Sequence, residues 1–243
     1  MKCRKCGARA VINMRQHKLA LCRDHYLTWI PEQTGRFIVK YSMFSPQDRV
    51  LVAVSGGKDS LGLWDILWRL GYKADGLYIG LGINGECDYS NESQRLSVKF
   101  AAERDLQLQV VSVPDSYGST IPEMSRLTLR GKGKPCSVCG LVKRHIMNQV
   151  AMDGGYTVLA TGHNLDDEAA VLFGNTLNWQ TGYLVRQSPV LEAHHPGLVR
   201  KVKPLFRFYE REMAAYALLQ GIEYIYDECP YAVGSKSIYY KEL

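Results

Sequence analysis

Three groups of residues in this 243-residue sequence have types and spacing that suit chemistry. The first is the string Ser-Gly-Gly-Lys-Asp-Ser at residues 55–60. It follows a β-branched run and precedes an apolar-periodic stretch, the pattern of a strand, a tight loop and a helix. Adjacent glycines let the backbone approach an anion, and the amide groups at a helix N-terminus point towards it. The loop is therefore predicted to hold phosphate groups.

The spacing of this loop excludes two common phosphate sites. A Walker A loop needs a glycine and a Ser or Thr where this sequence has Val52 and Asp59. A dinucleotide fingerprint needs glycines separated by one and then two residues, whereas Gly56 and Gly57 are adjacent and Gly62 is next. The loop is thus a phosphate site of another type, with an ordinary strand-to-helix turn as the simpler alternative.

The second group consists of Cys3, Cys6, Cys22 and His25, arranged as Cys-x-x-Cys and Cys-x-x-His. Two such pairs, separated by a hairpin-length insert, suit tetrahedral zinc. A segment this short has too small a core to fold alone, so the metal should supply much of its folding free energy. We predict a structural zinc finger over residues 1–28 and a connecting helix over residues 29–45.

The third group contains Cys136, Cys139 and Lys143, with Cys229 much later in the chain. If a helix begins near Cys136, the other two follow at i+3 and i+7, so all three side chains share one face. With Cys229 folded back, three thiolates favour an iron–sulfur cluster with one open iron, or a catalytic cysteine pair, over a closed zinc site. The spacing does not choose between cluster and thiol chemistry, and an inert buried pair is also compatible.

A further motif, Thr-Gly-His-Asn-Leu-Asp-Asp-Glu, occupies residues 161–168. Asn164 can cap a helix, and the acidic residues after it suit the first turn, which is a purely structural explanation. Opposite a phosphate loop, the same carboxylates can hold Mg²⁺ or transfer protons. His163 by itself is interpreted as structural.

Strands and helices must alternate to position these groups. Apolar patterns predict strands at 50–54, 74–79, 106–113 and 156–161, and helices at 60–70, 91–104, 141–152 and 166–177. Alternation predicts a doubly wound, mostly parallel α/β sheet covered on both faces. Ligands bind beyond the carboxyl ends of such strands, so Ser55, Ile79 and Gly162 should define one crevice.

Composition limits the remaining possibilities. A hydrophobic content of 46% supports a large core, and a net charge of +6 permits a polyanionic partner. Seven cysteines in Cys-x-x-Cys arrangements favour metal ligands or reactive thiols in a reducing compartment. Because neither a membrane-spanning run nor a signal peptide is visible, we predict a cytoplasmic protein without membrane association.

The order of these motifs, with Cys229-Pro230 last, resembles that of the tRNA 2-thiolation enzymes of the N-type ATP pyrophosphatase (PP-loop) superfamily, above all those acting on 5-methyluridine. The resemblance covers residues 1–242 and implies a PP-loop catalytic domain over residues 46–243. It implies that ATP, Mg²⁺, Zn²⁺ and a [4Fe–4S] cluster are used. The implied ATP site comprises Ala53, Val54, Ser55, Gly56, Gly57, Asp59, Ser60, Ile79, Lys143 and Gly162.

The same resemblance implies roles for individual residues and partners. Cys136, Cys139 and Cys229 would hold the cluster, while Lys143, Asp167 and Asp59 would assist catalysis. The enzyme would adenylate the C2 carbonyl of a tRNA uridine and replace its oxygen with sulfur from a ubiquitin-like thiocarboxylated carrier protein, acting as a homodimer. Candidates for holding tRNA phosphates are Lys132, Lys134, Lys201, Lys203 and Arg207.

Three alternatives stay open at this point. The enzyme could thiolate another base, such as the wobble uridine or a cytidine, or use persulfide chemistry on Cys136 and Cys229 without a cluster. A non-catalytic zinc RNA-binding module is the third. One departure is that the family usually carries a second zinc finger near its C-terminus, which this sequence lacks, so either truncation or a shortened homologue is expected. Cys87 has no assigned role.

Overall fold

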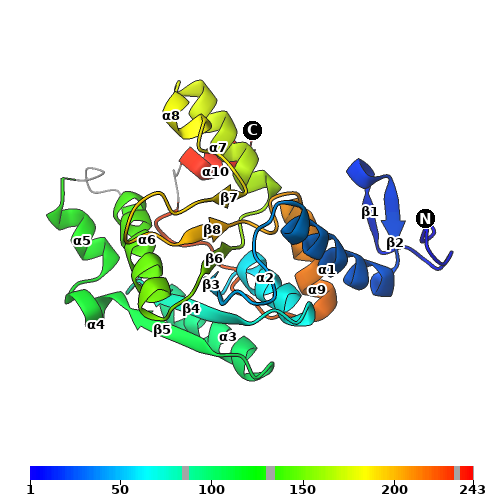
Figure 1. The fold of residues 1–243 in the computed structure, drawn as a ribbon, viewed down its shortest axis with the longest axis horizontal. Helices are drawn as coiled ribbons and strands as arrows, with labels where there is room; N and C mark the ends of the chain where they lie inside the picture. The colour runs from blue at the N-terminus through cyan, green and yellow to red at the C-terminus, as the bar shows by residue number, and fades with distance from the viewer. Residues whose placement is uncertain (84–87, 130–134, 233–235, 243) are drawn as a thin grey trace.

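The computed structural model describes residues 1–83, 88–129, 135–232 and 236–242. A six-stranded sheet forms its centre, in the order β5-β4-β3-β6-β8-β7, and all strands but β7 are parallel (Figure 1). This confirms the predicted mostly parallel α/β fold. The strands are β3 (Val50–Val54), β4 (Ala74–Gly80), β5 (Leu108–Ser112), β6 (Val158–Thr161), β7 (Val190–Leu191) and β8 (Arg200–Val202).

Helices cover both faces of the sheet, as expected for a doubly wound fold. Alternate residues of β3 point to opposite sides, so Val52 packs in a core with α1, α2 and α9, and Leu51 packs against α6. The helices of these two layers are α1 (Arg23–Lys40), α2 (Lys58–Arg69), α3 (Tyr89–Ala102), α6 (Pro135–Asp153) and α9 (Glu210–Gln220). The remaining helices are α4 (Val113–Tyr117), α5 (Ile121–Leu127), α7 (Leu165–Leu177), α8 (Thr181–Leu184) and α10 (Lys236–Glu242).

The N-terminal segment forms an antiparallel hairpin of β1 (Ile12–Met14) and β2 (Leu19–Leu21) around the short 3₁₀ helix η1 (Arg15–His17). It stands beside α1 and α9 at one end of the molecule (Figure 1). Met14 and Leu21 are fully buried and belong to the same core as β3 and α2. The segment therefore shares the hydrophobic core of the central sheet, so a metal would not be its only source of stability.

Two predicted helices begin six residues earlier in the structure than in the sequence pattern, at residue 23 and not 29, and at residue 135 and not 141. The connecting helix, predicted over 29–45, is α1, which begins at Arg23 because Cys22 has an extended backbone and Asp24 suits the first turn. It runs across the predicted boundary after residue 28 and ends at Lys40. The helix predicted from residue 141 begins at Pro135, a residue type that is favoured in the first turn. Both Cys136 and Cys139 therefore lie on α6.

A buried tryptophan joins α2 to the sheet. Trp64 is fully buried, and its indole N–H donates a hydrogen bond to the carbonyl of Ala74 (2.8 Å). A Cβ atom at Gly76 would lie 2.4 Å from the Trp64 ring, so β4 can approach α2 only with glycine there. This contact fixes α2, and with it the loop before α2, over the sheet. Among the described residues, no helix combines the length and apolarity needed to cross a membrane.

Candidate active site and metal centre

A cavity of about 400 Å³ lies at the carboxyl ends of β3, β4 and β6. The sequence placed Ser55, Ile79 and Gly162 at this edge, and all three line the cavity. Gly56 and Gly57 form the loop between Ser55 and α2. The other predicted nucleotide-site and catalytic residues in the cavity wall are Ala53, Val54, Asp59, Ser60, Lys143 and Asp167.

The backbone of the loop leaves no room for side chains at two positions. Gly56 has φ of +77°, and a Cβ atom there would lie 2.6 Å from the carbonyl oxygen of Ser93. At Gly162 a Cβ atom would lie 2.8 Å from the carbonyl carbon and oxygen of Asp59. The Ser60 hydroxyl donates to the carbonyl of Gly57 (3.0 Å) and accepts from the amide of Ser55 (3.1 Å). These contacts hold the loop in a single shape against α3 and β6.

Sequence reasoning missed the wall that α3 contributes to the cavity. Tyr89, Ser90 and Ser93 line it, and the hydroxyl of Tyr78 donates to the carbonyl of Ser90 (2.7 Å). Ser97, one turn further, is fully buried. Small polar residues at positions 90, 93 and 97 repeat at helical spacing, so this signal was available in the sequence.

A chain of ion pairs borders the cavity. Lys58 lies 2.7 Å from Glu210 and 3.3 Å from Asp59, and Lys241 lies 3.0 Å from Glu210 and 2.7 Å from Asp167. Burial disfavours the charged carboxylate and raises the pKa of Asp59, although the Lys58 ammonium acts in the opposite direction. No motif in the sequence indicates that residues 210 and 241 lie beside this site.

The structural explanation of the acidic motif is confirmed by the contacts at the start of α7. Asn164 caps α7, since its side chain accepts from the amide of Asp167 (3.1 Å) and the Asp167 carboxylate accepts from the amide of Asn164 (3.0 Å). The Asn164 amide also donates to Asp59 at 3.3 Å. The cap therefore ties the start of α7 to the phosphate loop. His163 lines the cavity as well, its ring 2.8 Å from the Thr161 hydroxyl, and burial lowers its pKa.

The three predicted cluster cysteines come together from α6 and the segment before α10. Burial raises the pKa of the Cys139 thiol, the Lys143 ammonium opposes that rise, and Cys229 and Cys136 add to it. Cys136 is exposed and donates a hydrogen bond to the carbonyl of Tyr231 (3.3 Å). Lys143 therefore faces both the cavity and the thiols. Cys87 lies outside the described residues.

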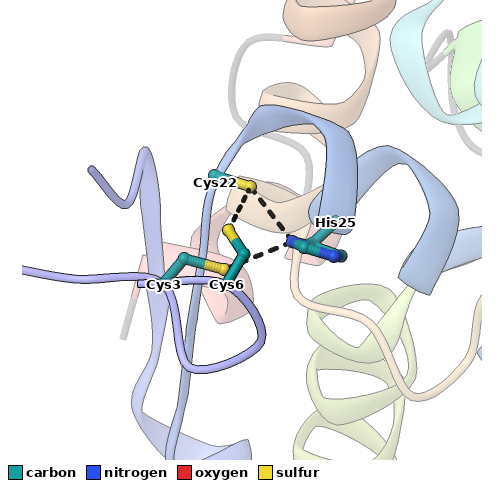
Figure 2. Close-up of side chains that lie close together, drawn as sticks. All are labelled: Cys3, Cys6, Cys22 and His25. Atoms are coloured by element: carbon teal, nitrogen blue, oxygen red, sulfur yellow. Dashed lines mark hydrogen bonds between the residues drawn. The ribbon is translucent and has the colours of Figure 1, made fainter. Parts of the chain in front are cut away.

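The four predicted zinc ligands converge at the N-terminal hairpin (Figure 2). Their ligand atoms all lie within 4.8 Å of one another. The Cys6 and Cys22 sulfur atoms are 3.7 Å apart, and His25 Nδ1 is 3.2 Å from Cys22 and 3.5 Å from Cys3. Zinc bond lengths of about 2.3 Å to sulfur and 2.05 Å to nitrogen give tetrahedral edges of roughly 3.8 and 3.6 Å. The donor set therefore fits zinc.

The electrostatics of this metal centre also suit a cation. Burial disfavours a thiolate at Cys3, but hydrogen bonds from backbone amides, including that of Cys22, outweigh it and lower the pKa of Cys3 to about 6. The centre is joined to the catalytic part through Glu212. The Tyr26 hydroxyl donates to the backbone carbonyl of Glu212 (2.6 Å), and the Gln16 side-chain amide donates to the Glu212 carboxylate.

Removing the metal is expected to loosen the hairpin without unfolding the sheet. Structural zinc contributes on the order of 10 kcal/mol in zinc-finger peptides. We therefore expect a chelator to accelerate amide hydrogen exchange over residues 2–22, while the amides of β3 stay protected. Exchange mass spectrometry with parallel metal analysis measures both. Cys22→Ser should reproduce the effect, whereas Cys229→Ser should keep its zinc. Unchanged exchange in zinc-free protein would contradict a structural role.

The side chains predicted to hold tRNA phosphates differ in how accessible and how charged they are in the structure. Lys203 pairs with Glu168 at 2.8 Å and is mostly buried, so its charge is already compensated. Burial lowers the pKa of Lys201, and the charge of Arg144 acts in the same direction. Arg207 is exposed, with its guanidinium 5.5 Å from the ring centre of Phe37. Lys132 and Lys134 lie outside the described ranges.

Comparisons with known proteins agree with this geometry. Residues 2–27 match the family described as 2-thiouridine synthetase TtuA, N-terminal LIM domain. The chain is 55% identical over 242 residues to tRNA-5-methyluridine(54) 2-sulfurtransferase of Thermus thermophilus, covering 100% of this chain and 73% of that protein. It is 41% identical over 244 residues to the protein of that name from Thermotoga maritima, covering 100% and 78%.

Solved structures with the same fold include the U34-tRNA thiolase NcsA from Methanococcus maripaludis with its [4Fe-4S] cluster. Its TM-score is 0.84 at 26% identity, and the match covers 100% of this chain and 80% of that one. The NH3-dependent NAD synthetase of Campylobacter jejuni has a TM-score of 0.52 at 15% identity, over 81% of this chain and 74% of that one. The second likeness concerns the fold alone.

Proposed function

We propose a reaction for this chain from one premise: it belongs to the tRNA-5-methyluridine(54) 2-sulfurtransferase family, whose substrate is tRNA. It is a tRNA sulfurtransferase. The proposed reaction is ATP-dependent replacement of the C2 oxygen of 5-methyluridine 54 by sulfur. The observation that carries this proposal is the position of Lys143, which lines the cavity and faces Cys139. A nucleotide site and a sulfur site can therefore act on one base.

In the first step, the C2 oxygen of the uridine attacks the α-phosphorus of ATP. A phosphorus–oxygen bond forms, the bond to the β-phosphate breaks, and pyrophosphate leaves while N3 loses its proton. The loop at residues 55–60 and the N-terminus of α2 are suited to hold the phosphates. Asp59, whose pKa is raised by burial, is the candidate acceptor of the proton. The product carries AMP on the former carbonyl oxygen.

In the second step, hydrosulfide sulfur bonds to C2 and the C2–O bond breaks. AMP leaves with the original oxygen and the electron pair, and the sulfur-bound proton moves to N3. Lys143 is placed to offset negative charge that develops between the sulfur and the phosphate. We assign Asp167 to orienting the reactants, because it lines the same cavity from the start of α7.

Cys136, Cys139 and Cys229 would hold the [4Fe–4S] cluster. Cys139 lies close enough to interact electrostatically with both Cys136 and Cys229 beside Lys143, which suits this group, and the similar thiolase NcsA carries such a cluster. With only three cysteines to hold it, the cluster would supply a site for the incoming sulfur. Enzymes with this loop use ATP with Mg²⁺, which would enter with the triphosphate near Asp59 and Asp167.

The proposal extends to partners and location. We propose a ubiquitin-like thiocarboxylated protein as the sulfur donor and a homodimer as the working form, both from the family resemblance. A cytoplasmic location is supported by the name of a more distant relative from Scheffersomyces stipitis, cytoplasmic tRNA 2-thiolation protein 1, which is 29% identical over 237 residues.

The function is tested by incubating the anaerobically purified chain with ATP, sulfide and tRNA that lacks the 2-thio modification. We expect one AMP and one pyrophosphate for each 2-thionucleoside formed, with the sulfur in the T-loop fragment by nucleoside mass spectrometry. Sulfur in an anticodon fragment would favour the wobble uridine or a cytidine as the target. Binding of tRNA without AMP formation would favour a non-catalytic RNA-binding module.

A further inference from the structure

Helix α10 lies along α7 (Figure 1). The surface of α7 leaves space for one aromatic ring of α10. At Gly174 of α7, a Cβ atom would lie 2.7 Å from the ring of Tyr240, so the ring occupies the space that a side chain would fill. The Phe173 ring meets the Tyr240 ring edge-on at 5.8 Å, and the Asn178 amide donates to the Tyr240 hydroxyl at 3.1 Å. These contacts give α10 a defined position on α7.

The residue after Tyr240 contacts the cavity wall at Asp167. Lys241 Nζ lies 2.7 Å from Asp167 Oδ1, while Asp167 Oδ2 accepts from the Asn164 amide at 3.0 Å. Both oxygens of this carboxylate are therefore held, one by α10 and one by its own helix cap. The Lys241 side chain is 26% exposed. Burial opposes its charge, but Asp167 and Glu210 outweigh burial and raise the pKa of the ammonium.

Lys241 also separates two like charges. Its ammonium lies between Asp167 on α7 and Glu210 on α9, and the other oxygen of Glu210 accepts from Lys58 of the phosphate loop at 2.7 Å. Without the ammonium, the two carboxylates would repel each other, and Asp167 would keep only the hydrogen bond of its helix cap against that repulsion. The position of Asp167 in the cavity wall thus depends on α10.

We propose that Lys241 is a positioning residue, which acts through Asp167 to keep that carboxylate in its productive orientation. The inference rests on the proposed function, in which Asp167 orients the reactants. The segment that supplies Lys241 also supplies Cys229 to the thiol group. One stretch of chain therefore contributes to both halves of the site.

The test compares Lys241→Met with Lys99→Met in ATP-dependent thiolation. Methionine keeps the apolar stem and removes the charge. Lys99 on α3 is the matched control, because it also bridges two carboxylates, Glu103 and Glu223, at a surface position. We expect Lys241→Met to lower kcat by about 100-fold, the order of loss that an ångström-scale misplacement causes, with KM for ATP nearly unchanged. Lys241→Arg should restore most of the rate.

A double-mutant cycle distinguishes positioning from a general structural role. If Lys241 acts through Asp167, adding Lys241→Met to Asp167→Asn should cause no further loss of kcat. An additive loss would overturn the proposal, as would a normal kcat in Lys241→Met, whatever its melting temperature. If wild-type protein thiolates tRNA and Lys241→Met has the same kcat, only the positioning role of Lys241 is refuted and the proposed function stands. A wild type unable to thiolate tRNA would refute the proposed function and this inference with it.

Discussion

Replacing Lys143 with methionine is expected to reduce ATP-dependent tRNA thiolation by about 10²- to 10³-fold, the loss typical of removing one group that stabilises transition-state charge. Lys143 lines the cavity proposed to bind ATP, and its charge opposes the rise in the pKa of Cys139. Both chemical steps place negative charge near this ammonium. The protein should stay folded, because the side chain is only half-buried on a 19-residue helix.

The measurement for Lys143→Met is single-turnover formation of AMP and of 2-thionucleoside. A loss in both products is expected, since the lysine serves the adenylation and the displacement. Lys99→Met again serves as the control for loss of one lysine charge. Thiolation within about threefold of wild type would show that Lys143 does not stabilise the transition state, because an effect that small is well below the expected range.

The second large effect is expected from Cys136→Ala, which should abolish detectable thiolation and lower bound iron. Two remaining thiols cannot hold a cluster that needs three protein ligands, so the loss should exceed the roughly 10- to 100-fold caused by removing an outer partner of a metal ligand. Because Cys136 is exposed, the substitution should cost little stability. Iron and sulfide analysis of anaerobically purified protein, with nucleoside mass spectrometry, measures both outcomes.

Cys6→Ser is the matched control for Cys136→Ala. It removes a thiol from the N-terminal centre, so zinc should fall while iron stays unchanged. Full activity of wild-type protein without iron would instead support persulfide chemistry on Cys136 and Cys229. Unchanged activity in Cys136→Ala would contradict both the cluster and the persulfide versions.

The sequence by itself determined the features that depend on near neighbours. The Cys-x-x-Cys and Cys-x-x-His pairs specify ligands that one turn or hairpin can bring together, and the structure joins all four. Apolar patterning located the strands whose carboxyl ends carry Ser55, Ile79 and Gly162 at or next to their last residues, because parallel strands must share one carboxyl edge. Helical spacing likewise put Cys139 and Lys143 on one face.

Only the tertiary structure decided which distant charges meet at the site. Glu210 and Lys241 carry no motif, yet they complete the ion pairs of Lys58 and Asp167. Lys203, a candidate for holding phosphate, forms an ion pair with Glu168. Local patterns fix the faces of single elements, whereas the pairing of charges depends on how α7, α9 and α10 pack together. That packing is set by contacts between residues far apart in the chain, such as Gly174 with Tyr240, and sequence spacing does not encode them.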